Sequence, residues 1–95
     1  MTIDFDNADM KDGFSIQLWD NPGKNQKLYL VTNQNSPVEV KLLNTTGQKV
    51  QLWNFNAFSG SNIYDLNLSN LSKGLYFIEV RMMVNGARKV IRLVN

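Results

Sequence analysis

Apolar and polar residues alternate in short stretches along most of the chain, and turn-forming residues separate these stretches. The first stretch, residues 14–19, places Phe14, Ile16 and Leu18 on one face, and an Asp-Asn-Pro-Gly segment follows it. Alternation with a period of two is typical of a β-strand that has one face on a core. The same criterion predicts seven strands, at residues 14–19, 27–32, 37–42, 48–55, 63–68, 75–83 and 88–94.

The predicted strands follow one another at regular intervals, and no segment has the periodicity of an amphipathic helix. Many short strands with turn signals between them are typical of two packed antiparallel sheets. We therefore predict an all-β protein, an immunoglobulin-like β-sandwich of about seven antiparallel strands, over residues 14–95. Residues 1–13 lack the alternation and are expected to form an acidic leader or linker.

Turn residues and one tyrosine support the sandwich. Gly47, Gly74 and Gly86 stand in predicted turns, where a residue without a Cβ can adopt a positive φ. Tyr76 lies near the start of a strand, and we expect a tyrosine corner, in which the hydroxyl binds the backbone of the preceding bend. The apolar positions expected in the core are Leu28, Leu30, Val38, Val40, Leu42, Val50, Leu52, Leu66, Leu68, Leu71, Tyr76, Ile78 and Val80.

The composition argues against an enzyme. The chain has 95 residues and a mass of 10.9 kDa, which is enough for one small domain. It contains no cysteine and no histidine, and this removes thiolate zinc sites, cysteine nucleophiles and histidine-dependent triads. The aspartates of the leader do not have the spacing of an EF-hand loop. We expect no catalytic residues, no metal and no cofactor.

Charge is unevenly distributed along the chain. Residues 1–20 carry five aspartates and one lysine, whereas residues 21–95 carry nine lysines and arginines and three acidic residues. Four of the basic residues lie in the last fifteen positions. This asymmetry favours a basic surface that meets an anionic partner. No recognition-helix or RNP-type pattern accompanies the basic residues, so we expect no nucleic-acid partner.

Four ordered blocks of sequence carry a resemblance to a known family. Asn21-Pro22 precedes Leu28-Tyr29-Leu30, a hairpin pattern with Gly47-Gln48 spans residues 38–50, a Leu-x-x-Gly-x-Tyr motif lies within residues 65–80, and Asn85-Gly86 precedes a basic terminal strand. Together the blocks resemble the C-terminal sorting domain of the type IX secretion system, found on cargo proteins of Bacteroidetes-type bacteria. The positions that match the family's motif are Asn21, Pro22, Gly47, Leu71, Gly74, Tyr76, Arg88, Lys89 and Arg92.

The resemblance implies that this domain is a folded address label. Such a domain is the tail of a larger cargo protein, which is covalently attached on its N-terminal side. Its implied partners are the outer-membrane translocon of the type IX system, a shuttle protein, and a sorting peptidase that removes the tail. The implied location is the periplasm in transit, and then the cell surface or the medium.

The last predicted strand is one plausible recognition element. A strand at the edge of a sheet can be read by strand addition, and Arg88, Lys89 and Arg92 would complement an acidic receptor. The alternative is that these three residues form a solvated face that discourages aggregation at the edge. The resemblance favours recognition.

Three aromatic residues suggest a different class of function. By strand parity, Trp19 lies opposite the apolar set of its strand, and Trp53 and Phe55 lie opposite Val50 and Leu52. Exposed rings of this kind could stack on a sugar, as in a carbohydrate-binding module of a secreted enzyme; an inert spacer domain is a further alternative. The alternative, which we favour, is structural: a β-bulge flips either strand, or these rings pack under the leader or the Ala57-Phe58 loop.

Overall fold

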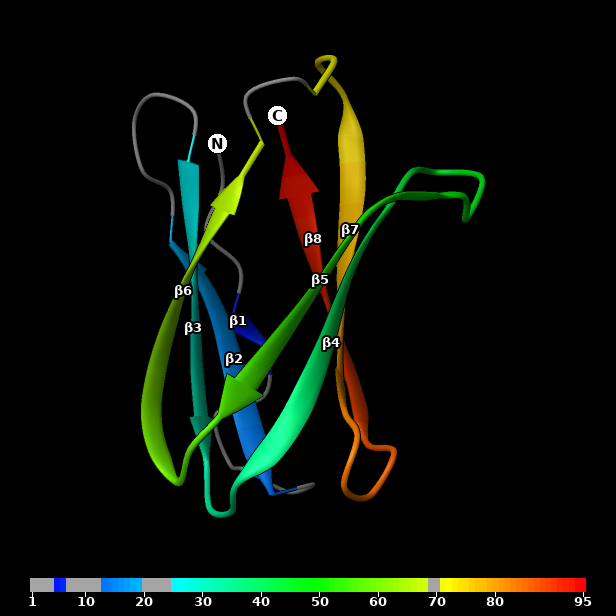
Figure 1. The fold of residues 1–95 in the computed structure, drawn as a ribbon. Coiled ribbons are helices and arrows are strands. Elements are labelled where there is room, and N and C mark those ends of the chain that lie inside the picture. The colour runs from blue at the N-terminus through cyan, green and yellow to red at the C-terminus, as the bar shows by residue number, and fades with distance from the viewer. Residues whose placement is uncertain (1–4, 7–12, 20–24, 69–70) are drawn as a thin grey trace.

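Two antiparallel sheets pack face to face in the computed structural model, which describes residues 5–6, 13–19, 25–68 and 71–95 (Figure 1). All of the regular structure in these residues is β-strand, and they contain no helix long and apolar enough to cross a membrane. The strands are β1 (Phe5–Asp6), β2 (Phe14–Trp19), β3 (Asn25–Thr32), β4 (Ser36–Leu43), β5 (Lys49–Ala57), β6 (Gly60–Asn67), β7 (Leu75–Met82) and β8 (Arg88–Val94).

The predicted β-sandwich is confirmed, and the seven predicted strands correspond to β2 to β8. Sheet 1 has the order β1-β2-β3-β6 and sheet 2 has the order β5-β4-β7-β8. The chain crosses from one sheet to the other after β3, β5 and β6, so that β3 pairs with β6 and β4 pairs with β7. Such crossed pairings are the connections of an immunoglobulin-like sandwich.

A short additional strand, β1, lies in the segment that was expected to be a leader, and it pairs with β2. In β1, Phe5 lies opposite Gln17 and Asp6 lies opposite Ile16, at the edge of sheet 1. The boundary between leader and domain at residue 13 stays a prediction, because residues 7–12 lie outside the described part of the chain.

The core lies between the two sheets and consists of the inward-facing residue of each alternating pair. Nine of the thirteen predicted core residues are fully buried, and Leu71 and Tyr76 are partly buried and pack against them. Strand alternation also buries residues outside that prediction. These further core residues are Phe14, Ile16, Leu18, Ala57, Met82, Ile91 and Leu93.

The prediction that Val50 and Leu52 belong to the core is wrong. Their exposed fractions are 45% and 38%, whereas Trp53 and Phe55 pack against the core. The cause is a β-bulge: Leu43 lies opposite Lys49 but Leu42 lies opposite Gln51, so Val50 has no partner on β4. A shift of one residue moves every following side chain of a strand to the other face. The bulge therefore reverses the faces of β5.

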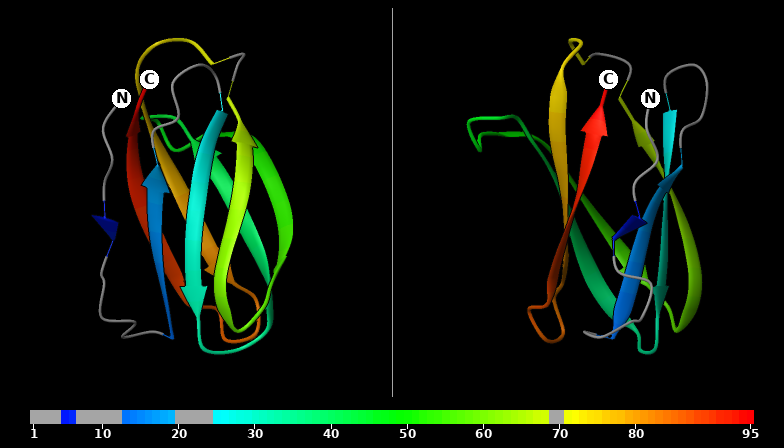
Figure 2. Two further views of the ribbon diagram at one scale, coloured as in Figure 1. Left: turned by 90° about the vertical axis from the view of Figure 1, so that its left-hand side faces the viewer. Right: turned by 180° about the vertical axis from the view of Figure 1, so that it is seen from behind.

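The two lateral sides of the sandwich are closed in different ways. On one side, Phe55 of β5 stacks on Tyr64 of β6 with ring centroids 4.2 Å apart, and the Tyr64 hydroxyl donates to the Asn56 carbonyl (3.0 Å). Burial raises the pKa of Tyr64 above its ordinary value of 10.0. On the other side, β8 of sheet 2 lies beside β1 and β2 of sheet 1, without pairing with them (Figure 2). β8 is therefore at the edge of its sheet, as the recognition hypothesis requires.

Candidate functional site

The terminal strand β8 separates its three basic residues between two faces. Its burial alternates, so that Lys89, Ile91 and Leu93 are buried while Arg88 and Arg92 are exposed. Lys89 is only 6% exposed, and its Nζ lies over the ring of Phe14, 5.4 Å from the centroid. The structure therefore does not place the three predicted cations on one surface. The strand's parity in the sequence could have shown this, since positions 88 and 92 share a face and position 89 does not.

The two outward arginines lie among side chains of β7. Arg88 lies opposite Arg81 and makes an ion pair with Glu79, whose carboxylate is 3.7 Å away. Arg92 lies opposite Phe77. These neighbours are outward-facing residues of β7, and none of them is among the predicted site residues.

The predicted tyrosine corner is confirmed. The Tyr76 hydroxyl donates to the Ser72 carbonyl at 2.8 Å, which ties the start of β7 to the bend before it. Asn95 reaches the same bend: its side-chain amide donates to the carbonyls of Leu71 and Ser72, both at 3.2 Å. Its main chain also exchanges two hydrogen bonds with Gly74, at 2.9 and 3.2 Å.

The Leu-x-x-Gly-x-Tyr block and the end of β8 thus form one hydrogen-bonded unit. Sequence reasoning missed Asn95, because its role depends on a strand pairing that brings residue 95 beside residue 74. No local pattern announces such a contact.

The three predicted turn glycines all have positive φ: 85° at Gly47, 150° at Gly74 and 76° at Gly86. Gly47 closes the turn between β4 and β5, where the Asn44 side-chain oxygen accepts from the backbone N–H groups of Thr46 (3.0 Å) and Gln48 (2.9 Å). A side chain at position 47 would be strained in that conformation, although nothing crowds the space around it. The role of Gly47 visible here is therefore to shape the hairpin.

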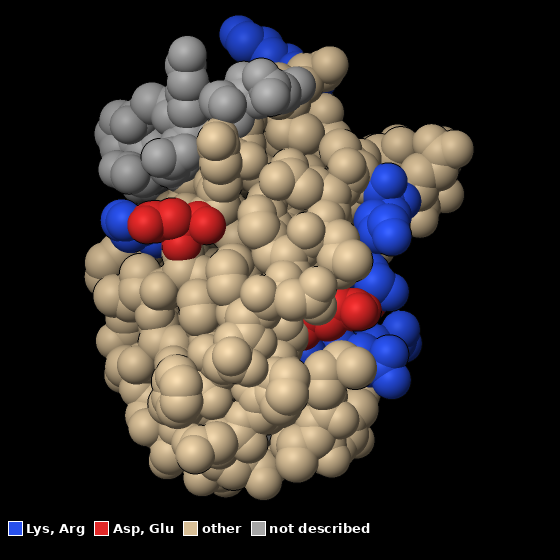
Figure 3. All heavy atoms as spheres, in the orientation of Figure 1, with Lys and Arg blue, Asp and Glu red and all other residues tan. Residues whose placement is uncertain are grey.

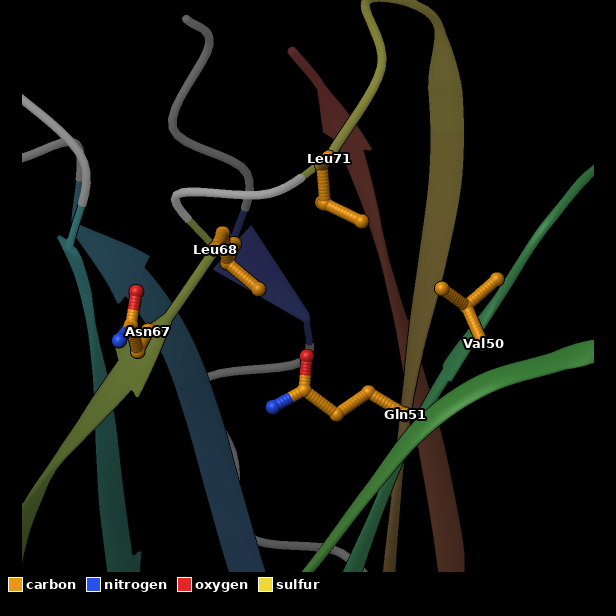
Figure 4. Close-up of a pocket in the computed structure, with 5 residues that line it drawn as sticks. All are labelled: Val50, Gln51, Asn67, Leu68 and Leu71. Carbon is orange, nitrogen blue, oxygen red and sulfur yellow. The ribbon is translucent and has the colours of Figure 1, made fainter.

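A cavity of about 250 Å³ opens at the end of the sandwich where β5 begins. Figure 4 shows Leu68 and Leu71 on one side of this space and Val50 and Gln51, from β5, on the other. Asn67 completes the lining. Two leucines, a valine and two amides line it, so these side chains offer neither a titratable group nor a nucleophile. The cavity lies between Leu71, one of the predicted motif positions, and Val50, the extra residue of the bulge.

The three aromatic residues proposed for sugar stacking do not lie on one surface. Trp19 is 42% exposed on the outer face of sheet 1, where its ring lies parallel to that of Tyr29 with centroids 5.4 Å apart. Trp53 and Phe55 lie on the inner face of sheet 2, because of the bulge. The sugar-stacking alternative required Trp53 and Phe55 to point outward, and their position against the core contradicts it.

Two members of the predicted motif, Asn21 and Pro22, lie outside the described residues. Within the described part of the chain, no group of three or more acidic, histidine or cysteine side chains is placed to hold a metal ion.

Comparison with known proteins places most of the sandwich in a family. A protein-family model described as "Secretion system C-terminal sorting domain" matches residues 17–93, from within β2 to within β8. The match therefore includes strands of both sheets, the bend at residues 71–74 and most of the terminal strand. No curated protein matches the chain.

Proposed function

We propose that this chain, which belongs to the family of C-terminal sorting domains of the type IX secretion system, directs a covalently attached cargo protein across the outer membrane. The family implies a cargo on the N-terminal side and export to the cell surface or the medium. The observation that carries the proposal is the match over residues 17–93, which covers both sheets of the sandwich and not one isolated motif.

In this proposal the domain is a ligand and not a catalyst. The outer-membrane translocon and a shuttle protein bind the folded sandwich after the cargo has reached the periplasm of a Bacteroidetes-type cell, and a sorting peptidase then removes the domain. The outward direction of Arg88 and Arg92 supports a part for this strand in recognition.

A reporter fusion tests the proposal. The full chain is attached to the C-terminus of a reporter exported to the periplasm, in a cell with a working type IX system and in a matched cell without the translocon. We expect the reporter at the surface or in the medium of the first cell and in the periplasm of the second. Retention in the periplasm of both, while a known sorting tail is exported, would refute the proposal. A carbohydrate-binding module or a spacer predicts that same retention.

A folding control tests whether the export machinery recognises the folded domain or the motif as a linear sequence. Ile78 is fully buried in β7, and Ile78→Asp places an uncompensated charge in the core. If the machinery reads the folded sandwich, this variant is retained even though every residue of the proposed motif is unchanged. Export of an unfolded Ile78→Asp variant would show that the motif is read as an extended peptide.

A further inference from the structure

The outer face of sheet 2 combines apolar and basic side chains in a way that the fold itself does not require. Strand register places Leu43, Phe77 and Arg92 in one row across β4, β7 and β8. Leu75 and Val94 lie opposite each other beside that row. The apolar side chains on this face are Leu43, Leu52, Leu75, Phe77, Val90 and Val94, and the basic ones are Lys41, Lys49, Arg81, Arg88 and Arg92. We call this surface the sheet 2 outer face.

Strands β7 and β8 carry apolar residues on both sides, although charged residues accompany them on the outer side. Their inner sides carry buried Ile78, Val80, Ile91 and Leu93. On the outer sides, Leu75, Val90 and Val94 have exposed fractions of 38%, 47% and 41%. Exposed apolar residues that cluster on a surface and are bordered by polar ones are typical of a protein interaction site. The pattern therefore indicates that another surface covers this one.

The charge of the sheet 2 outer face indicates the chemistry of that surface. Its five basic side chains face only two acidic ones, Glu39 and Glu79. Each acid lies near a cation of the same face: Glu39 is 3.3 Å from Lys41, and Glu79 is 3.7 Å from Arg88. Figure 3 shows Lys and Arg side chains gathered along the right-hand border of the molecule, over sheet 2. An excess of positive charge attracts and orients an acidic partner.

We infer that the sheet 2 outer face is the surface on which an acidic partner protein packs, with an apolar centre against Phe77 and the Leu75–Val94 pair. The inference rests on the proposed function, because the partner is then a component of the export machinery that binds the domain. A protein fits better than an anionic lipid surface, since the acidic, basic and apolar side chains of this face can all be matched by a protein surface, whereas a uniform layer of phosphate groups matches only the cations. Face-on packing also leaves β1 and β2 in place beside β8, whereas strand addition to β8 would compete with them for space.

A pair of variants with equal change in net charge tests the position of the site. Arg81→Ser with Arg92→Ser removes two positive charges from the sheet 2 outer face, and both side chains are exposed. Ser15→Glu with Ser61→Glu adds two negative charges to the outer face of sheet 1, as the matched control. In the reporter fusion, we expect the first variant to lower export by about tenfold or more and the control to stay within about twofold of the unmodified chain.

The outcomes separate the inference from the function on which it rests. If the unmodified chain is not exported, the proposed function fails. If the unmodified chain is exported and the arginine variant is exported equally well, or the two variants lose export equally, the sheet 2 outer face is not the binding surface. Thermal unfolding of the purified domains checks that both variants fold.

A second pair tests the apolar centre, and a lipid assay tests the class of partner. Phe77→Ser should lower export by about fivefold or more, while Ile63→Ser, at an exposed apolar position of sheet 1, should leave it unchanged. Equal effects of the two variants would overturn the apolar centre.

Vesicles of phosphatidylglycerol should not retain the purified chain at physiological salt. Retention that the arginine variant abolishes would show that the face binds an anionic membrane and not a protein.

Discussion

The two sheets share one core but present different surfaces to the outside. The outer face of sheet 1 carries polar and aromatic residues with an isolated exposed Ile63, and its described charged residues are Lys27 and Asp65, which make an ion pair with each other. The outer face of sheet 2 is apolar and basic, and its strand register is interrupted by a bulge. Since the inner faces suffice to form the core, the outer apolar residues of sheet 2 are available for binding. The proposed binding surface therefore lies on the sheet whose outer face is basic as well as apolar.

The largest expected effect concerns strand register. In sheet 1 the pairing of β3 with β2 and β6 is regular. Deletion of Tyr29 from β3 therefore moves the side chains of one half of that strand to the opposite face of the sheet. We expect this deletion to abolish the folded state, which for a domain of this size is worth about 5–10 kcal/mol. Deletion of Val50 removes only the extra residue of the bulge and leaves Leu42 opposite Gln51, so the domain should still fold. Circular dichroism and urea unfolding measure both, and equal losses would contradict the assigned bulge.

Truncation of buried leucines compares the inner faces of the sheets. Leu30 of sheet 1 and Leu42 of sheet 2 are both fully buried, so Leu30→Ala and Leu42→Ala should each lower the free energy of unfolding by about 2–5 kcal/mol. Leu52→Ala serves as the control, because the bulge turns this leucine outward, and it should cost less than about 1 kcal/mol. A cost of Leu52→Ala as large as the other two would place Leu52 back in the core.

Removing hydrogen bonds at the bend should have a smaller effect. Tyr76→Phe and Asn95→Ala each delete side-chain donors to the Ser72 carbonyl, where the chain passes from sheet 1 to sheet 2. We expect each to lower the free energy of unfolding by about 1 kcal/mol. The double variant should lose less than the sum, since both side chains hold the same bend. Strict additivity in urea unfolding would show that the two act separately. Tyr29→Phe, on the outer face of sheet 1, is the control and should change stability by less than about 0.5 kcal/mol.

The smallest expected effect is a dependence of stability on alkaline pH. Burial raises the pKa of Tyr64 in the folded state, so the unfolded chain loses this proton first as the pH rises past about 10. The contribution of the protonated hydroxyl is complete below the unfolded pKa and is lost as the pH rises through the folded pKa. Urea unfolding between pH 8 and 11 should therefore show a steeper alkaline decline for the unmodified chain than for Tyr64→Phe. Parallel curves would show that the hydroxyl is not desolvated between the sheets.

Strand alternation predicted most of the fold, because each inward position is set by the residues next to it in sequence. Phe14, Ile16 and Leu18 are buried as their parity requires. The same rule failed in β5, where the faces depend on how the Asn44–Gln48 turn joins the two strands and where the extra residue is placed. A bulge changes the register without changing the alternation, so the pattern of β5 alone could not reveal it.

The candidate site was predictable only in part. The motif positions Leu71, Gly74 and Tyr76 do form one bend, as local spacing suggested. Asn95 joins them through a contact between residues far apart in sequence, which no local pattern encodes. Phe77 and Leu75 were visible in the sequence as part of an apolar run, but only the strand order shows that they lie beside Arg92 and Val94 on one exposed face.

The position of β1 at the edge of sheet 1, with β2 next to it, has a mechanical consequence. A force transmitted from a cargo on the N-terminal side reaches β1 first, whose two residues pair with β2, and then reaches β2 at Phe14. Phe14 lies beside Lys89 at the start of β8, whereas Asn95 follows its end, so a load between Phe14 and Asn95 runs along the strands and the pairs of the β2–β3 ladder resist it together. Single-molecule pulling between the two termini should record a small step for the loss of β1 and then a larger step when β2 separates from β3. Under tension the domain yields at the sheet next to its load and keeps the shape of the other.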